Sequence, residues 1–207
     1  MSNVRFTRPS RFPPVVKYLI ITNAIIFILQ STIGAQWGLT ETIMLYPVQD
    51  PSFRPYQIIT HMFAHGGITH ILFNMLALWM FGSILENYWG DKRFLNFYII
   101  CGIGAAAFHL LVQYLTGNGT PALGASGAIM GLLAAFGYLF PNTEMIIFPI
   151  PFPIKAKWAV LGMAAFDVFG GLGYISDNVA HFAHLGGAIT GFILVFFWSR
   201  KDRSHFY

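Results

Sequence analysis

Long apolar runs separated by short polar clusters organise most of this chain. An α-helix needs about 20 predominantly apolar residues to cross the hydrocarbon core of a bilayer, and several runs approach that length. The runs lie at about residues 15–34, 68–89, 94–115, 126–140, 158–174 and 180–198. This pattern predicts an all-α polytopic membrane protein with six transmembrane helices, of which the fourth is short.

The segments between the runs predict turns and one larger insert. Residues 90–93 predict a polar turn, residues 116–121 an uncharged break, and the proline-rich residues 141–155 an irregular loop. Residues 35–67 are too long and too apolar for a plain loop. We therefore predict that they form a folded insert lying at the membrane surface.

The predicted organisation is a single membrane domain with short ends. Residues 1–14 form a basic head, residues 15–198 the membrane domain and residues 199–207 a tail. The first run has an alternative interpretation as a signal peptide cleaved near Ala35. Its length and the membrane-like composition of the remaining chain favour a first span instead.

The composition excludes an ordinary water-soluble globule. Apolar residues make up 56% of the 207 residues and charged residues only 10%, whereas soluble domains carry about 25% charged residues. The single cysteine, Cys101, excludes an intrachain disulfide and a cysteine zinc cluster.

The placement of the basic residues predicts the orientation in the membrane. If six spans start from a cytoplasmic N-terminus, every one of the 12 Lys and Arg residues except Arg54 falls on the cytoplasmic side. This distribution satisfies the positive-inside rule and predicts that both chain ends are cytoplasmic. The bases form small clusters and not a stripe with interleaved aromatic residues, so the net charge of +4 does not indicate nucleic acid as a partner.

Polar residues interrupt the apolar runs at three places. A polar side chain inside a membrane is costly unless it pairs, faces water or takes part in chemistry. In the second run, His70 and Asn74 are four residues apart, so they lie on one helix face and both can donate hydrogen bonds. The alternative is that the two side chains join this helix to a neighbouring helix.

The second place is Ser126, which opens the fourth run between Gly124 and Gly127. A serine at a helix start has an exposed hydroxyl beside backbone N–H groups that lack helical partners. This arrangement suits a nucleophile next to a developing oxyanion. The alternative is an N-cap serine whose flanking glycines allow close helix packing.

The third place is His184, near the start of the sixth run. Gly187 and Gly191 follow it four residues apart, and the fourth run carries an equivalent glycine pair. Because small-residue faces let two helices approach closely, this spacing would bring His184 beside Ser126 at similar depth. A histidine that reaches a serine is a candidate general base, whereas the alternative is a histidine that serves only in packing.

Together these features resemble the rhomboid family of intramembrane serine proteases. The features that carry the resemblance are His70-x-x-x-Asn74, Gly124-x-Ser126-Gly127, Ala183-His184-x-x-Gly187-x-x-x-Gly191 and the six-span pattern. The resemblance covers about residues 15–198 and implies a six-helix rhomboid-like bundle.

The resemblance also implies a role for each matching residue. Ser126 would be the nucleophile, and His184 the general base and then the general acid. His70, Asn74 and the backbone N–H of Ser126 would form the oxyanion hole. The glycines that would be packing positions near the site are Gly124, Gly127, Gly187 and Gly191.

The family does not require a third acid. Asp167 and Asp177 are the nearby candidates for one, and we interpret Asp167 as structural. The insert at about residues 35–67 corresponds to the first loop of the family, and the resemblance implies that His61 and His65 help to hold this loop together.

Two positions depart from the family pattern. Met130 stands where the family often has a tyrosine that stacks under the catalytic histidine. Tyr56-Gln57 stands where the family often has Trp-Arg in the first loop, so we expect the loop to be anchored differently.

The resulting prediction is a serine endopeptidase that acts inside the lipid bilayer. Its substrates would be single-span membrane proteins, cleaved near the outer face, and the reaction would need neither cofactor nor metal. The absence of a long transit peptide favours a bacterial plasma membrane.

Three other classes of protein compete with this prediction. A membrane metal protein could use His61, His65 and His70, although no His-Glu-x-x-His string is present. A client-binding relative would usually lack the serine or the histidine. A transporter or channel is disfavoured because no inverted repeat is recognisable and few charges lie inside the spans.

Overall fold

The computed structural model describes residues 10–117, 119–146, 151–173 and 180–203 and is mostly helical. The elements are α1 (Pro14–Ser31), α2 (Ile33–Gln36), α3 (Leu39–Ile43), α4 (Gln57–Thr60), a 3₁₀ turn (His61–Phe63), α5 (Ile68–Ala77), a π-helical segment (Leu78–Gly82), α6 (Ser83–Trp89), α7 (Asp91–Thr116), α8 (Ser126–Leu139), β1 (Glu144–Met145), β2 (Ile154–Lys155), α9 (Ala156–Gly171) and α10 (His181–Arg203).

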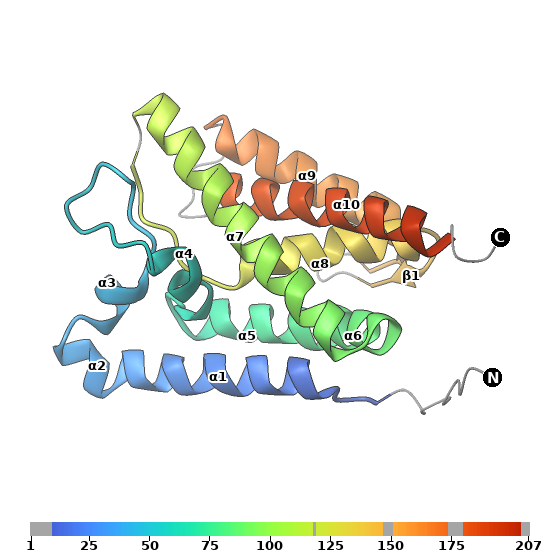
Figure 1. Cartoon of the computed structure of the whole chain (residues 1–207), viewed down its shortest axis with the longest axis horizontal. Helices are drawn as coiled ribbons and strands as arrows, with labels where there is room; N and C mark the ends of the chain where they lie inside the picture. Colours follow the sequence, from blue (N-terminus) through green and yellow to red (C-terminus); the bar gives the residue numbers. More distant parts are fainter. Residues whose placement is uncertain (1–9, 118, 147–150, 174–179, 204–207) are drawn as a thin grey trace.

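The long helices form a bundle with two distinct ends (Figure 1). Helix α1 begins and α10 ends at one of them, which we call the terminal end. Helices α2, α3 and α4 of the first loop lie at the other, which we call the loop end.

Four helical segments of the described chain are long and apolar enough to cross a membrane. They are Pro14–Ser31, Ile68–Trp89, Asp91–Thr116 and His181–Arg200. Helix α8, with 14 residues, and α9, with 16, are shorter. The prediction of a helical membrane protein is therefore confirmed, whereas the number of crossings and their direction stay predictions.

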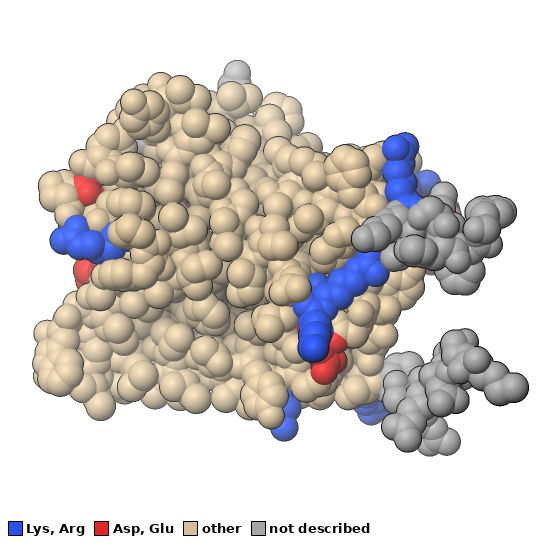
Figure 2. All heavy atoms as spheres, in the orientation of Figure 1, with Lys and Arg blue, Asp and Glu red and all other residues tan. Residues whose placement is uncertain are grey.

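Charge is unevenly distributed along the bundle. On the face in Figure 2, Lys and Arg side chains gather mainly toward the terminal end, and a broad uncharged surface separates them from a small charged patch at the loop end. Large apolar side chains such as Ile28, Leu72 and Phe197 are exposed on the outer helices. An uncharged apolar surface of this kind suits contact with lipid.

The structure corrects three of the predicted segments. The turn predicted at residues 90–93 reduces to Gly90, whose φ of +79° ends α6, and α7 begins at Asp91. The second span is not one regular α-helix, because a π-helical segment interrupts it at Leu78–Gly82. In the loop predicted at residues 141–155, β1 and β2 pair in antiparallel fashion.

Helix α8 forms the centre of the bundle. Every residue from 127 to 137 is buried, and α7, α9, α10 and the π-helical segment all contact this helix. The uniformly apolar composition of α8 explains this position, since a helix that is apolar all round is buried on all sides. Ser126, the first residue of α8, is thus held by the most enclosed element of the fold.

Glycine faces set the distance between α8 and α10. A Cβ atom on Gly187 would overlap the carbonyl oxygen of Gly127. One on Gly191 would lie 2.5 Å from the carbonyl oxygen of Gly131. The structure thus brings together the two small-residue faces, and the start of α10 lies against the start of α8.

This contact gives a stability prediction. Gly187→Ala would force α8 and α10 apart, and overpacking of this kind typically costs about 1–3 kcal/mol. Gly162→Ala is the matched control, because a Cβ atom at Gly162 in α9 would meet no atom within 4 Å. Thermal unfolding in detergent should show a lower midpoint for Gly187→Ala and an unchanged or higher one for Gly162→Ala. Equal midpoints would contradict the packing argument.

Candidate active site

Ser126 and His184 lie in contact, although 58 residues separate them in the sequence. The distance from His184 Nε2 to Ser126 Oγ is 2.8 Å. Ser126 is the first residue of α8 and His184 lies in the first turn of α10. The glycine contact between these helices places the two turns at the same level, so the side chains meet without a long reach.

Asp167 of α9 completes a chain of hydrogen bonds behind His184. The Nδ1 atom of His184 lies 3.0 Å from Asp167 Oδ1, and the Nδ1 atom of His181 lies 2.9 Å from the same oxygen. Asp167 is only 3% exposed. The sequence named Asp167 as a candidate third acid, although we interpreted it as structural, and the structure places it in contact with His184. Asp177, the other acid considered, lies outside the described residues.

Gly124 allows His70 and Ser126 to approach one another. Its φ is +122°, a backbone conformation that favours glycine. A Cβ atom at Gly124 would lie 2.7 Å from His70 Nε2 and 3.6 Å from Ser126 Oγ. The imidazole of His70 therefore occupies space that any larger residue at 124 would fill.

His70 and Asn74 differ in their hydrogen bonds. The backbone N–H of Gly66 donates to His70 Nδ1 at 3.4 Å, so in the neutral ring the proton is on Nε2, the atom nearest Gly124. Asn74 is 7% exposed, and its Nδ2 has no hydrogen-bond partner among the described residues. In the described part of the chain, neither the Nε2–H of His70 nor the Nδ2 of Asn74 has a hydrogen-bond partner.

The first loop supports the segment that leads into Ser126. Leu45 and Ala122 exchange two backbone hydrogen bonds of 2.8 and 2.9 Å. The carbonyl oxygen of His61 accepts a hydrogen bond from the N–H of Gly124 at 2.9 Å, and His61 Nδ1 lies 2.8 Å from the carbonyl oxygen of Gln57. The loop is therefore joined to the turn that precedes Ser126 through backbone hydrogen bonds.

Gln57, which stands in place of the arginine of the family's Trp-Arg pair, anchors the first loop. Its side chain is 1% exposed. Its Oε1 accepts from the backbone N–H groups of Tyr46 and Arg54, and its Nε2 donates to the carbonyl oxygens of Thr42 and Ser52. One buried amide thus connects several turns of the loop.

His61 and His65 are uncharged at neutral pH. Burial lowers the pKa of His61 to about 4, against a partly opposing hydrogen bond to the Gln57 backbone. Burial also lowers the pKa of His65 to about 4, and nearby His70 adds to the shift. No group of three His, Cys, Asp or Glu side chains able to hold a metal ion exists in the described part of the chain.

The buried His65 ring gives a pH prediction. Neither of its ring nitrogens has a hydrogen-bond partner among the described residues. The unfolded chain takes up a proton near pH 6.5, whereas the folded one does so only near pH 4, so stability should fall as the pH drops through this window. His65→Phe should match the native thermal midpoint at pH 7.5 and lose less of it at pH 5. An unchanged pH dependence in His65→Phe would refute this role.

Met130, His109 and Gln113 also lie near the site. Met130 is buried in the core, one helical turn after Ser126. His109 and Gln113 of α7, which sequence reasoning missed, both direct Nε2 at the carbonyl oxygen of Thr120. Their spacing of four inside an apolar run is the same signal that singled out His70 and Asn74.

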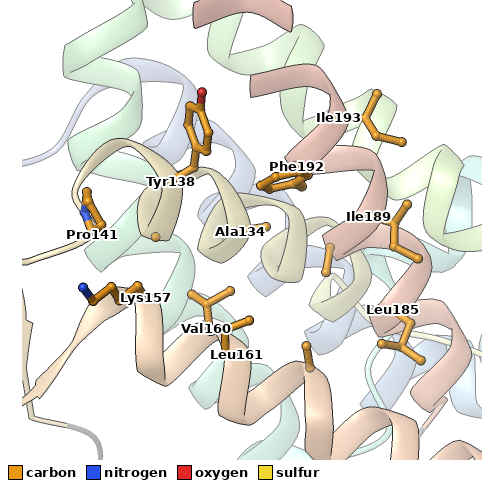
Figure 3. Close-up of a pocket in the computed structure, with 13 residues that line it drawn as sticks. Ala134, Tyr138, Pro141, Lys157, Val160, Leu161, Leu185, Ile189, Phe192 and Ile193 are labelled. Atoms are coloured by element: carbon orange, nitrogen blue, oxygen red, sulfur yellow. The ribbon is translucent and has the colours of Figure 1, made fainter. Parts of the chain in front are cut away.

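A separate apolar groove lies between α8, α9 and α10, with a volume of about 480 Å³ (Figure 3). Ala134, Leu161 and Ile189 line it, and Lys157 lies at one end. Leu185 also lines it, but Ser126 and His184 do not. The groove is therefore distinct from the space in front of the Ser126 hydroxyl.

Comparison with known proteins places this chain in a family. Residues 52–201 match the Rhomboid domain family. Rhomboid protein 1, mitochondrial, of Saccharomyces cerevisiae is 36% identical over 167 residues, covering 79% of this chain and 47% of that protein. Rhomboid protease GluP of Bacillus subtilis is 31% identical over 185 residues, covering 86% of this chain and 34% of that protein.

A third relative is the presenilin-associated rhomboid-like protein, mitochondrial, of Mus musculus. It is 32% identical over 177 residues, covering 84% of this chain and 45% of that protein. This chain thus spans less than half the length of the curated relatives named here. Two of the three carry mitochondrial names, so they do not support the expected bacterial plasma membrane.

The match to the Rhomboid domain extends from the first loop into the last turn of α10 and includes all the residues that meet at Ser126. The chain therefore belongs to the rhomboid family.

Proposed function

We propose that this protein is an intramembrane serine endopeptidase with Ser126 as nucleophile and His184 as general base. The observation that carries the proposal is the 2.8 Å distance between Ser126 Oγ and His184 Nε2 in a bundle of apolar helices. A nucleophile and a base within hydrogen-bond reach are the minimum that acyl transfer requires.

The first half of the reaction forms an acyl-enzyme. Ser126 Oγ attacks the scissile carbonyl carbon while His184 Nε2 takes the hydroxyl proton. The tetrahedral intermediate collapses as the carbon–nitrogen bond breaks, and the imidazolium of His184 gives its proton to the leaving amine.

The second half restores the enzyme. A water molecule gives a proton to His184 Nε2 as its oxygen attacks the ester carbon. The bond to Ser126 Oγ then breaks, and the serine oxygen takes the proton back. The His184 side chain is 18% exposed, which leaves a path for this water from outside the helix core.

Donors for the developing oxyanion come from three sources. The backbone N–H of Ser126 lies at the N-terminus of α8, where the first N–H groups have no helical acceptor. His70 Nε2 and Asn74 Nδ2 would supply side-chain N–H groups from α5. Such donors matter most in a site with little water, because competing solvent does not weaken them.

The substrates would be single-span membrane proteins cleaved near the outer face. The site lies toward the loop end of the bundle, away from the basic residues at the terminal end (Figures 1 and 2). With the basic end cytoplasmic, as in the six-span prediction, the site faces the outer leaflet. A helix hides its carbonyl groups in hydrogen bonds, so cleavage requires a substrate helix that unwinds at this depth.

Cleavage in liposomes tests the proposal. Purified protein would be reconstituted with a single-span substrate whose helix carries small residues and glycine near one end. The proposal predicts two fragments, with a new terminus inside the apolar segment, and neither fragment with Ser126→Ala or His184→Ala. Binding of the substrate without cleavage by the native protein would favour a client-binding relative instead.

A further inference from the structure

We infer that Asp167 is a positioning residue that keeps the proton of neutral His184 on Nδ1 and so leaves Nε2 free to accept the Ser126 proton. This inference rests on the proposed function of Ser126 and His184. It extends the dyad, because the family resemblance requires no third acid.

The donor and acceptor chemistry of the three groups determines which ring nitrogen of His184 carries the proton. An ionised carboxylate only accepts hydrogen bonds, so the 3.0 Å contact between Asp167 Oδ1 and His184 Nδ1 requires a proton on Nδ1. A neutral imidazole carries one ring proton, and Nε2 therefore has a lone pair. That lone pair lies 2.8 Å from Ser126 Oγ, where a general base must be.

The Asp167 carboxylate is itself held in place. His181 Nδ1 reaches the same Oδ1 atom at 2.9 Å. The His181 ring lies against Gly170, where a Cβ atom would overlap it, and its centroid is 5.8 Å from that of Phe166. Phe166 and Gly170, one turn apart on α9, thus pack against His181. His181 in turn holds the Asp167 carboxylate in position.

Burial of Asp167 makes its hydrogen bonds necessary. Asp167 is 3% exposed, and an isolated carboxylate at such a site is costly. Two N–H donors on one oxygen offset that cost. The buried carboxylate is therefore bonded to His184 as well as to His181, and the same bond holds the His184 ring in place.

Asp167→Asn tests the inference with little change in shape. If the amide N–H₂ faces His184, it donates to Nδ1 and moves the ring proton to Nε2, which can no longer accept from Ser126. We expect kcat to fall about 10²-fold with KM nearly unchanged. The loss is smaller than the 10⁴-fold known for such a change elsewhere, because the amide oxygen can also face His184.

A matched control separates catalysis from folding. Glu86 is another buried acid, at the terminal end, where its carboxylate accepts hydrogen bonds from the backbone N–H groups of Val15 and Val16. Glu86→Gln should lower the thermal midpoint and leave the kcat of the folded protein within about twofold. Asp167→Glu, which keeps the charge, should recover part of the activity lost in Asp167→Asn.

The second readout is spectroscopic and independent of turnover. Nitrogen-15 spectra of histidine-labelled protein, with His184 assigned by its loss in His184→Ala, should show a protonated Nδ1 in the native protein. An unprotonated native Nδ1, or a kcat for Asp167→Asn within threefold of native, would overturn the inference. A native protein that cleaves nothing would instead count against the proposed function, while the spectrum would still decide the role of Asp167.

Discussion

Ser126→Ala should abolish peptide-bond cleavage, with a loss of kcat on the order of 10⁴–10⁶. Without the hydroxyl there is no atom to form the acyl-enzyme, and the 2.8 Å contact to His184 Nε2 disappears. His184→Ala should cost nearly as much, because the serine proton then has no acceptor. The double variant should be no worse than either single one, since the two residues act as a unit.

Ser83→Ala is the matched control for this result. Ser83 is a buried serine in α6, and its Oγ has no hydrogen-bond partner among the described residues. Its replacement should leave cleavage unchanged. The assay is the rate of product formation at saturating substrate in liposomes. Retention of more than a few per cent of native kcat by Ser126→Ala would rule out this serine as the nucleophile.

Asn74→Leu should separate activity from stability. Loss of one oxyanion donor typically lowers kcat by about 10²–10³, and because the interaction forms mainly in the transition state, KM should change little. A buried amide without a partner costs the folded state about 1–3 kcal/mol. Since Asn74 Nδ2 has no partner among the described residues, Asn74→Leu should melt at the native temperature or above it.

Asn23→Leu provides the comparison for Asn74→Leu. Asn23 is also buried, but its Nδ2 donates to the carbonyl oxygen of Leu19 at 2.8 Å within α1. Because this bond is lost, Asn23→Leu should lower the melting temperature and leave kcat unchanged. If Asn74→Leu instead lowered the melting temperature and left kcat unchanged, Asn74 would be a packing residue and the oxyanion assignment would be wrong.

The parts of the candidate site that depend on spacing along one helix could be predicted from the sequence. His70 and Asn74 share a helix face, and the glycine pairs of α8 and α10 predict close approach, which implies contact between the turns of Ser126 and His184. These inferences need only helix periodicity and the size of glycine.

Contacts that depend on the direction of side chains between helices could not be predicted from the sequence. Asp167 reaches two histidines only because of the rotation of α9 about its axis, which composition does not encode. The four bonds of Gln57 depend on the path of a loop with little regular structure. The π-helical segment at Leu78–Gly82 likewise depends on packing against neighbours and not on a local signal.

Covalent labelling of Ser126 tests the central claim most directly. The native protein in detergent would be treated with a fluorophosphonate, digested and analysed by mass spectrometry. We expect one adduct on Ser126 in the native protein, and none in His184→Ala, because an isolated serine hydroxyl is a poor nucleophile. A folded native protein without an adduct on Ser126, or equal labelling of His184→Ala, would contradict that claim.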